Sequence, residues 1–304
     1  MASNATTEPD SSLVWLITGC SSGFGIEFVR QILARGDRVI ATARNPSKVA
    51  NHPNLPQADD RLWLLALDVT ASQESLNETI AIAIKIYGKI DVLVNNAGYV
   101  ALGGWEDLGY EGFVKQFETN VFGLMKVTNA VLPHMRERRT GTLVFISSLS
   151  GWKGDGFCGA YGASKFAVEG MVEALQEEVA PLGIRTLLIE PGMFRTNLLS
   201  PGNVLGNVSQ IDDYKKGSEA ILGTFANADL KQRGDPVEGV RIILDVVRNE
   251  GVASAEQQAE RNGPLKLRLP LGPDAYETLK KKCDETLELL SGWESVVKST
   301  DVRE

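Results

Sequence analysis

The chain has 304 residues, of which 43% are hydrophobic and 23% are charged, and its mean hydropathy is −0.08. These values are typical of a globular protein with enough apolar residues for a large core. The net charge of −8 and the pI of about 5.1 argue against a nucleic-acid-binding protein and against binding to an anionic membrane surface.

The N-terminal residues and the cysteines indicate where the protein resides. Residues 1–11 are polar, so we predict a disordered tail and no signal peptide. No segment reaches the roughly 18 apolar residues that a membrane span requires. The three cysteines lack paired spacing, and the two histidines lack metal-ligand spacing. We therefore expect a reduced, cytoplasmic protein with no metal site.

Short runs rich in leucine and β-branched residues alternate with longer helical patterns along the chain. The expected strands are 13–18, 38–42, 62–67, 91–95, 142–147, 185–190 and 265–269. The expected helices are 23–34, 72–87, 111–136, 158–181, 214–226 and 236–249. This alternation predicts an α/β fold, a doubly wound, Rossmann-type parallel sheet of seven strands flanked by helices. No linker divides it, so we predict one domain over residues 12–270.

Residues 271–304 are expected to form a C-terminal helical extension near the substrate pocket. Asp274 and Glu277 have the spacing of a capping box, and Gly292 offers an end to the helix. An apolar stripe recurs at three- and four-residue steps, at Tyr276, Leu279, Cys283, Leu287 and Leu290. Such a stripe must cover another surface.

A glycine-rich turn follows the first expected strand. Gly19, Gly23 and Gly25 let backbone N–H groups approach a pyrophosphate, and the next helix adds the positive potential of its N-terminus. Their spacing, TGxxxGxG, differs from the common GxGxxG of dinucleotide-binding folds. The position of this turn at the start of a strand–helix alternation favours a nucleotide site over an ordinary turn.

The end of the second expected strand bears on the choice of cofactor. A carboxylate there binds the ribose 2′-hydroxyl of NAD, whereas a nearby arginine suits the 2′-phosphate of NADP. This chain has no acid at that point, and Arg44 follows the strand directly. We therefore favour NADP(H) over NAD(H).

Tyr161 and Lys165 are spaced so that they lie on one face of a helix, one turn apart. With a nicotinamide cofactor expected, Lys165 together with the oxidised nicotinamide would stabilise the phenolate and lower a pKa that is ordinarily near 10. Tyr161 could then exchange a proton with a carbonyl or alcohol oxygen as hydride moves. Ser148, thirteen residues earlier, could hydrogen-bond the same oxygen.

These motifs resemble the short-chain dehydrogenase/reductase family in its single-domain branch. The resemblance covers about residues 12–200 and is most like the 17β-hydroxysteroid- and retinol-dehydrogenase-like members. It is carried by the glycine turn after Thr18, Asp68 in LDVT, NNAG at 95–98, ETNVFG at 118–123, the Ser148/Tyr161/Lys165 set, and PGMFRT at 191–196.

The resemblance implies a role for each matched residue. Tyr161 would be the general acid/base, and Lys165 would lower its pKa and hold the nicotinamide ribose. Ser148 would orient the substrate oxygen, although the adjacent Ser147 leaves the register open, and Asn120 would support a water relay. Asn95 would brace the sheet. The implied cofactor-binding residues are Thr18, Gly19, Ser21, Ser22, Gly23, Phe24, Gly25, Arg44, Asp68, Val69, Asn96, Ala97, Gly98, Tyr161, Lys165, Pro191, Gly192, Met193 and Thr196.

Apolar residues around these motifs suggest a bulky apolar or aromatic substrate, similar to a steroid, a retinoid or a secondary metabolite. The candidate substrate residues are Leu149, Trp152, Phe157, Phe194, Leu198 and Leu199. The Gly/Asn/Ser-rich stretch at 200–210 is interpreted as a mobile lid. The family also implies a homodimer or homotetramer, paired through the helices at 111–136 and 158–181.

Two other functions fit the same motifs. A nicotinamide-dependent epimerase or lyase would have the same residues, and a non-catalytic NADPH-binding regulatory protein would keep the nucleotide site alone. The complete set of Asn120, Ser148, Tyr161 and Lys165 favours an NADPH-dependent oxidoreductase that interconverts a carbonyl and an alcohol.

Overall fold

The computed structural model describes residues 12–56, 58–200, 202–260 and 267–302. The predicted N-terminal tail lies outside these residues. The strands are β1 (Val14–Ile17), β2 (Arg38–Ala43), β3 (Leu62–Ala66), β4 (Val92–Asn95), β5 (Val100–Ala101), β6 (Gly141–Ile146), β7 (Ile184–Pro191), β8 (Val204–Leu205) and β9 (Arg268–Leu271). The helices are α1 (Gly23–Ala34), α2 (Ser47–Ala50), α3 (Gln73–Tyr87), α4 (Trp105–Phe117), α5 (Leu124–Arg138), α6 (Gly159–Val179), α7 (Asp212–Ala228), α8 (Pro236–Arg248), α9 (Ala255–Glu260) and α10 (Pro273–Lys298).

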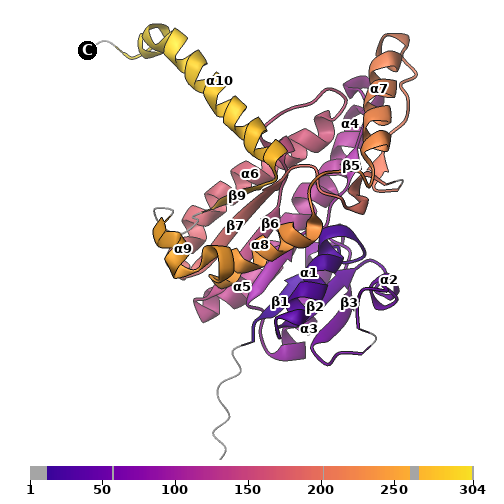
Figure 1. Cartoon of the computed structure of the whole chain (residues 1–304), viewed down its shortest axis with the longest axis vertical. Coiled ribbons are helices and arrows are strands. Elements are labelled where there is room, and N and C mark those ends of the chain that lie inside the picture. Colours follow the sequence, from indigo (N-terminus) through magenta and orange to yellow (C-terminus); the bar gives the residue numbers. More distant parts are fainter. Residues whose placement is uncertain (1–11, 57, 201, 261–266, 303–304) are drawn as a thin grey trace, which may run out of the picture.

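Seven strands of the described chain form one parallel sheet in the order β3-β2-β1-β4-β6-β7-β9, which confirms the predicted fold (Figure 1). The strand order reverses between β1 and β4, the point where doubly wound sheets open a crevice for ligands. A separate short sheet pairs β5 with β8. No helix in the described ranges is long and apolar enough to cross a bilayer.

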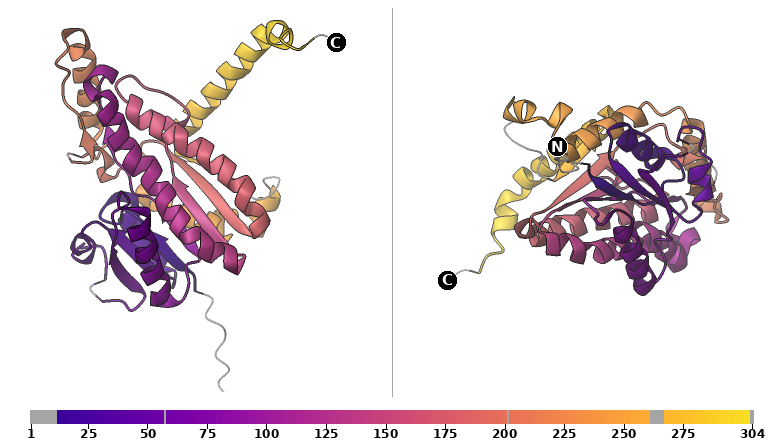
Figure 2. Two further views of the ribbon diagram at one scale, coloured as in Figure 1. Left: turned by 180° about the vertical axis from the view of Figure 1, so that it is seen from behind. Right: turned by 90° about the horizontal axis from the view of Figure 1, so that it is seen from below.

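Helices cover both faces of the sheet, and each face has its own apolar core. Helices α1 and α8 pack on one face, where their side chains join those of β1 and β2 in a buried cluster. Helices α3, α5 and α6 cover the other face, as the view from behind in Figure 2 shows. Burial on both faces explains why the strands are apolar without alternation.

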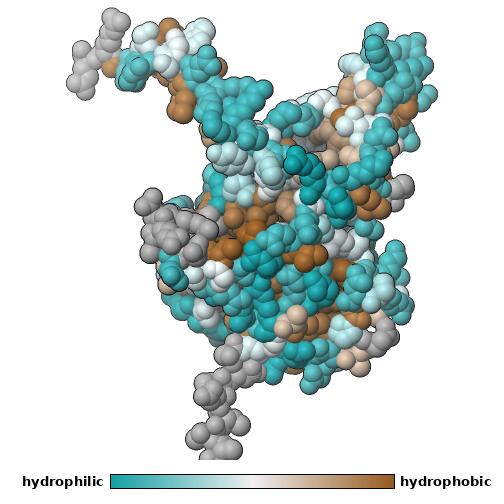
Figure 3. All heavy atoms as spheres, in the orientation of Figure 1, coloured by the Kyte–Doolittle hydropathy of each residue, from teal (hydrophilic) through white to brown (hydrophobic). Residues whose placement is uncertain are grey.

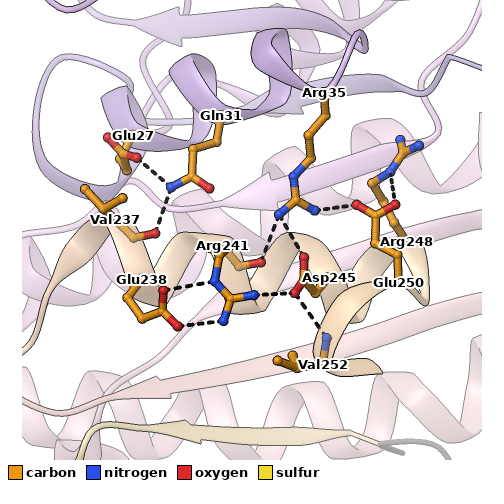
Figure 4. A network of polar contacts seen from close by, with 10 residues as sticks. All are labelled: Glu27, Gln31, Arg35, Val237, Glu238, Arg241, Asp245, Arg248, Glu250 and Val252. Carbon is orange, nitrogen blue, oxygen red and sulfur yellow. Dashed lines mark hydrogen bonds and ion pairs between the residues drawn. The ribbon is translucent and has the colours of Figure 1, made fainter. Parts of the chain in front are cut away.

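A polar network fastens α8 to α1 and so fixes the helix that follows the glycine turn (Figure 4). The Arg35 guanidinium donates to Asp245 Oδ1 at 2.8 Å and to Glu250 Oε1 at 2.6 Å. The Gln31 side chain donates to the Val237 carbonyl at 2.7 Å. Because Asp245 is buried, removing Arg35 would leave its carboxylate with Arg241, at 2.6 Å, as its remaining charged partner among the described residues.

The expected helix at 111–136 is not continuous. It begins as α4, passes through a π-helical segment at Glu118–Gly123, and continues as α5. Within this segment Asn120 Oδ1 accepts a hydrogen bond from Tyr99 N, and Asn120 Nδ2 donates one to the Tyr99 carbonyl. A π-helical turn inside a longer helix is often found at functional sites.

Three expectations for the C-terminal region are wrong. The seventh strand lies at 268–271, where it pairs with β7, and not at 265–269; residues 265–266 lie outside the described chain. Pro270 fits because β9 is an edge strand. Asp274 does not cap α10, because its carboxylate accepts a hydrogen bond from Met193 N at 2.6 Å. The helix also continues through Gly292, since one glycine costs only about 1 kcal/mol in a helix.

The extension is helical, as expected, but it does not cover the substrate pocket. Helix α10 contacts the body near its start, at β9, at the short turn Leu149–Gly151 and at Met193. From Lys280 onward every described residue is exposed. Figure 1 shows the helix extending away from the sheet, so its apolar stripe covers nothing in the single chain.

Candidate active site

The loop from β1 to α1 is shaped to receive an anion. Gly19 and Gly23 have φ angles of +72° and +57°, a region that favours glycine. A Cβ at Gly19 would lie 2.8 Å from Ala97 Cα, and one at Gly25 would lie 2.4 Å from the Gly19 carbonyl oxygen. The first turn of α1 has no acidic residue, and Ser22 makes no side-chain cap. The N–H groups of this turn are therefore available for a pyrophosphate, as a dinucleotide requires.

A cavity of about 610 Å³ begins at this loop and runs along the carboxyl ends of the strands to Tyr161. Most of the predicted cofactor residues line it. They are Gly19, Ser21, Ser22, Gly23, Phe24, Arg44, Asp68, Val69, Asn96, Ala97, Gly98, Tyr161, Lys165, Pro191, Gly192 and Thr196, and Ser148 joins them. Residues from six strand ends thus meet at one crevice, as the strand order predicts.

Three predicted cofactor residues do not line the cavity. The Thr18 hydroxyl accepts hydrogen bonds from Asn96 N at 3.0 Å and Ala97 N at 3.1 Å, so it holds the NNAG turn in place. Gly25 packs against the backbone of the glycine turn. Met193 lies beside the cavity, where its backbone binds Asp274. These residues shape the walls of the site from behind.

The adenosine end of the cavity combines a cation and an anion. Arg44 is exposed and lines the cavity, and within the described residues it makes no hydrogen bond or ion pair. Asp68 accepts hydrogen bonds from the backbone and hydroxyl of Thr70 at 2.9 and 2.8 Å. Burial alone would raise the pKa of Asp68, but these bonds and the Arg44 cation hold it below its ordinary value. Asp68 is therefore ionised at neutral pH.

Ser148, Tyr161 and Lys165 meet at the other end of the cavity. All three are buried, and a hydrogen bond joins the hydroxyls of Ser148 and Tyr161. Lys165 Nζ lies 5.7 Å from the centre of the Tyr161 ring and donates to the Ile146 carbonyl at 2.8 Å. Ser147 instead donates its hydroxyl to Glu169. The structure therefore places Ser148, and not its neighbour, against the phenol.

The protein groups around Tyr161 and Lys165 set the protonation of this pair. Burial raises the pKa of Tyr161 above its ordinary value, and the bond to Ser148 offsets only part of that rise. Burial likewise lowers the pKa of Lys165 to about 8, although the Glu169 carboxylate opposes this. At neutral pH the phenol keeps its proton while the amine is largely charged. Tyr161 is thus a proton donor beside a cation.

Asn120 lies behind the cavity and does not line it. Its side chain binds the Tyr99 backbone, and its Nδ2 also donates to Ser164 Oγ at 3.3 Å. The Ser164 hydroxyl in turn donates to the Tyr161 carbonyl at 2.6 Å. Asn120 therefore ties the π-helical segment to the turn of α6 that carries Tyr161. The side chain of Asn95, which was expected to brace the sheet, donates a hydrogen bond from β4 to Thr128 Oγ1 on α5 at 3.0 Å.

Of the six candidate substrate residues, Phe194 and Leu198 line the cavity. The other four, Leu149, Trp152, Phe157 and Leu199, do not. Trp152 turns away, since its indole donates to Glu190 Oε1 at 2.9 Å and its ring lies 5.0 Å from the Arg268 guanidinium. Phe157 packs edge-on against Tyr214 instead. The turns that carry these aromatic residues direct their side chains out of the cavity.

Other residues line the cavity in place of these four, and no motif in the sequence predicts them. The pairing of β5 with β8 brings Tyr99, Asn203 and Leu205 to the cavity wall. The stretch predicted to be a lid thus lines the cavity and is tied to β5. Beside Tyr161 lies a small apolar cluster, made of Val100, Leu102 and Cys158 with Val204, Ile221, Leu222 and Phe225 packed against it.

Behind the site lies a buried ionic network that sequence reasoning missed. Glu169 and Glu190 both accept hydrogen bonds from one nitrogen of Arg268, and Glu169 also binds Ser147. Arg268 binds the exposed Glu173 as well, at 2.6 Å. Burial together with the charge of Glu190 raises the pKa of Glu169 to about 7. The network joins α6, β6, β7 and β9 directly beneath Ser148.

This raised pKa predicts a pH-dependent stability. The stabilisation linked to a raised carboxyl pKa is complete below the unfolded value of about 4.5 and is lost as pH rises through about 7. Glu169→Gln removes the titrating carboxyl and with it that loss. Between pH 5 and pH 8, the free energy of unfolding of the variant should therefore rise by about 1–3 kcal/mol relative to that of the unmodified protein. Thermal unfolding at both pH values tests this, with Glu173→Gln at the exposed end of the network as the control. Parallel pH dependences for the Glu169 variant and the unmodified protein would contradict it.

Comparison with known proteins agrees with this geometry. The family model for short chain dehydrogenases matches residues 13–203. Oxidoreductase BOA17 of Botryotinia fuckeliana is 34% identical over 271 residues, which cover 89% of this chain and 93% of that protein. Human retinol dehydrogenase 8 is 38% identical over 205 residues, 65% of this chain and 63% of that protein.

Solved structures resemble the chain over most of its length. A short-chain dehydrogenase from Streptomyces avermitilis has a TM-score of 0.81 and 36% identity, with 97% of this chain and all of that chain covered. The structure of ElxO with NADP bound has a TM-score of 0.65 and 25% identity, with 85% of this chain and 96% of that chain covered. This chain therefore belongs to the short-chain dehydrogenase/reductase family and is an oxidoreductase.

Proposed function

We propose that the protein transfers hydride between NADP(H) and a carbonyl or alcohol carbon of a bulky apolar substrate. The observation that carries this proposal is the hydrogen-bonded Ser148–Tyr161 pair with Lys165 at the end of the cavity. NADPH supplies the hydride when it is bound. A substrate oxygen at this point would accept a hydrogen bond from Ser148 and a proton from Tyr161. The Lys165 cation stabilises the phenolate that remains.

The residues fit a dinucleotide along the whole cavity. The glycine turn and the N-terminus of α1 would hold the pyrophosphate, and Asp68 lies where the adenine would bind. Lys165 would hold the nicotinamide ribose, and Thr196 lies where the carboxamide would bind. Arg44, which follows β2 and lines the cavity, would bind a 2′-phosphate. The NADP found in ElxO supports this choice of cofactor for a chain that shares its fold.

Arg44 provides a direct test of cofactor preference. Arg44→Asp removes a charge-assisted contact to the 2′-phosphate and adds a repulsive charge, so NADPH affinity should fall at least about tenfold, corresponding to roughly 1.5–3 kcal/mol. NADH affinity should be unchanged or improved. Fluorescence titration of both cofactors measures this, and Lys48→Asp, at a nearby exposed lysine outside the cavity, is the control. Tighter binding of NADH than NADPH by the unmodified protein would refute the assignment.

The substrate class is proposed from the apolar surface near Tyr161. Phe194 and Leu198 line the cavity, and the cluster around Leu102 and Leu222 lies next to the phenol. A steroid-, retinoid- or secondary-metabolite-like ketone or aldehyde would bury its apolar body there. The similarity to retinol dehydrogenase 8 supports such a substrate. A spectrophotometric screen of NADPH oxidation with ketones of increasing apolar size tests the class.

Two alternatives predict different results in the same assay. A nicotinamide-dependent epimerase or lyase would turn over substrate without net consumption of NADPH. A non-catalytic NADPH-binding protein would bind the cofactor and consume none. The buried, hydrogen-bonded proton donor beside a charged lysine favours the oxidoreductase, because nucleotide binding alone does not require it.

A further inference from the structure

Helix α10 stands apart from the body and exposes large apolar side chains. Its first turn is fixed by the buried Ala275 and by the Asp274 contact to Met193, but no residue beyond Leu279 is buried. Half or more of each of the following side chains is exposed: Tyr276, Leu287, Leu289, Leu290, Trp293, Val296 and Val297. Figure 3 shows such brown residues on the outer half of the helix. An apolar surface of this extent on one helix indicates a contact with another molecule.

The spacing of these residues is that of a helix that pairs with another helix. Tyr276, Cys283, Leu290 and Val297 recur every seven residues, and Leu279 and Trp293 follow two of them by three. These are the a and d positions of a heptad repeat. Leu287, Leu289 and Val296 flank them on either side and widen the apolar face. Such a stripe matches a second helix better than it matches the surface of a globular body.

Charge decides which helix and in which direction. In this heptad Lys280 and Glu294 both lie at e positions, beside the apolar stripe, whereas Lys281 and Glu288 lie at f positions on the opposite side of the helix. Two copies of α10 side by side in the same direction would bring lysines against lysines. In opposite directions Lys280 of each copy lies beside Glu294 of the other. The exposed ion pairs within the helix, such as Lys280–Asp284 at 2.6 Å, are weak enough to rearrange.

We propose that α10 pairs in antiparallel orientation with α10 of a second copy of this chain. The pairing has two-fold symmetry, so each copy presents the same surface to the other. It buries the apolar stripe of both helices and places Lys280 of each copy beside Glu294 of the other. A membrane surface fits less well, because residues 280–298 carry four lysines and four acids and the whole chain is strongly acidic.

Charge reversal provides a test that leaves the folded body intact. One variant carries Lys280→Glu, Lys281→Glu and Lys282→Glu, and the other carries Glu285→Lys, Glu288→Lys and Glu294→Lys. Each variant alone has like charges along both halves of α10, so its mass in sedimentation equilibrium should fall by half relative to the unmodified chain. An equimolar mixture should restore that mass, because each half of one variant then faces the opposite charge on the other. Lys48→Glu with Lys85→Glu, on the body, is the control and should have no effect.

Each other result overturns the proposal. A monomeric unmodified chain, or single variants of unchanged mass, would show that α10 does not join two copies. If the single variants lose mass but the mixture does not regain it, α10 packs on another part of the second copy. If the unmodified chain binds anionic lipid vesicles but has the mass of one copy in sedimentation equilibrium, the stripe binds a membrane instead. Unchanged NADPH binding in all variants verifies that the body is folded.

Discussion

Tyr161→Phe should lower the rate of hydride transfer to a ketone by at least about 10²–10⁴-fold, the usual contribution of a positioned general acid. The substitution removes only the hydroxyl that bonds Ser148 and keeps the buried ring in place. The raised pKa of Tyr161 means that the unmodified enzyme holds this proton at neutral pH. Single-turnover measurement with saturating NADPH isolates the chemical step.

Affinity for NADPH should persist in this variant, because the glycine turn, Arg44 and Lys165 are unchanged. Tyr99→Phe is a matched control, since Tyr99 lines the same cavity and is partly buried, but its pKa is raised by burial alone, without a hydrogen bond to Ser148. The control should keep its rate within a few-fold. A Tyr161→Phe enzyme that reduces the ketone at nearly the original rate would show that the proton comes from another group.

The parts of the site that follow from local sequence could be predicted. The glycine turn needs φ values that only glycine adopts easily, and the i, i+4 spacing of Tyr161 and Lys165 fixes their shared helix face. The alternation of strands and helices then determines the order in which their ends meet. These features depend on neighbours in the chain, so a single sequence contains them.

The parts that depend on long-range register could not be predicted. Trp152 lies close in sequence to Ser148, but its indole bonds Glu190 on β7 and turns from the cavity. Nothing in the sequence near Glu169 indicates that Arg268, 99 residues later, would neutralise it. The spacing of its apolar residues predicts the stripe of α10 but not what covers it. Every described residue from Lys280 onward is exposed, so the predicted position of the stripe at the pocket is wrong.

The same distinction applies to the pKa of Tyr161. The sequence shows a cation one turn from the phenol, which suggests a lowered pKa. It does not show that both groups are buried, and burial disfavours the charged form of each. The Lys165 amine therefore loses its proton more readily than a free lysine does. Its charge becomes the pH-sensitive element of the site.

Lys165→Met should reduce both turnover and NADPH affinity, because the methionine keeps the length of the buried stem but removes its charge. The phenolate then forms without a neighbouring cation, and the ribose loses a hydrogen-bond donor. We expect a fall of at least about 10²-fold in kcat/KM for NADPH. Lys115→Met is the control, since Lys115 lines the same cavity but is exposed.

The pH profile separates loss of this charge from simple loss of packing at Lys165. With a pKa of about 8, the amine of the free enzyme is charged below that pH and neutral above it. For the unmodified enzyme, kcat/KM for NADPH should therefore be constant below about pH 8. Above that pH it should decrease, with a limiting slope of about tenfold per pH unit. Lys165→Met should have a low value without this break. If the variant keeps the same break, the ionisation belongs to a different residue and Lys165 does not supply the cation.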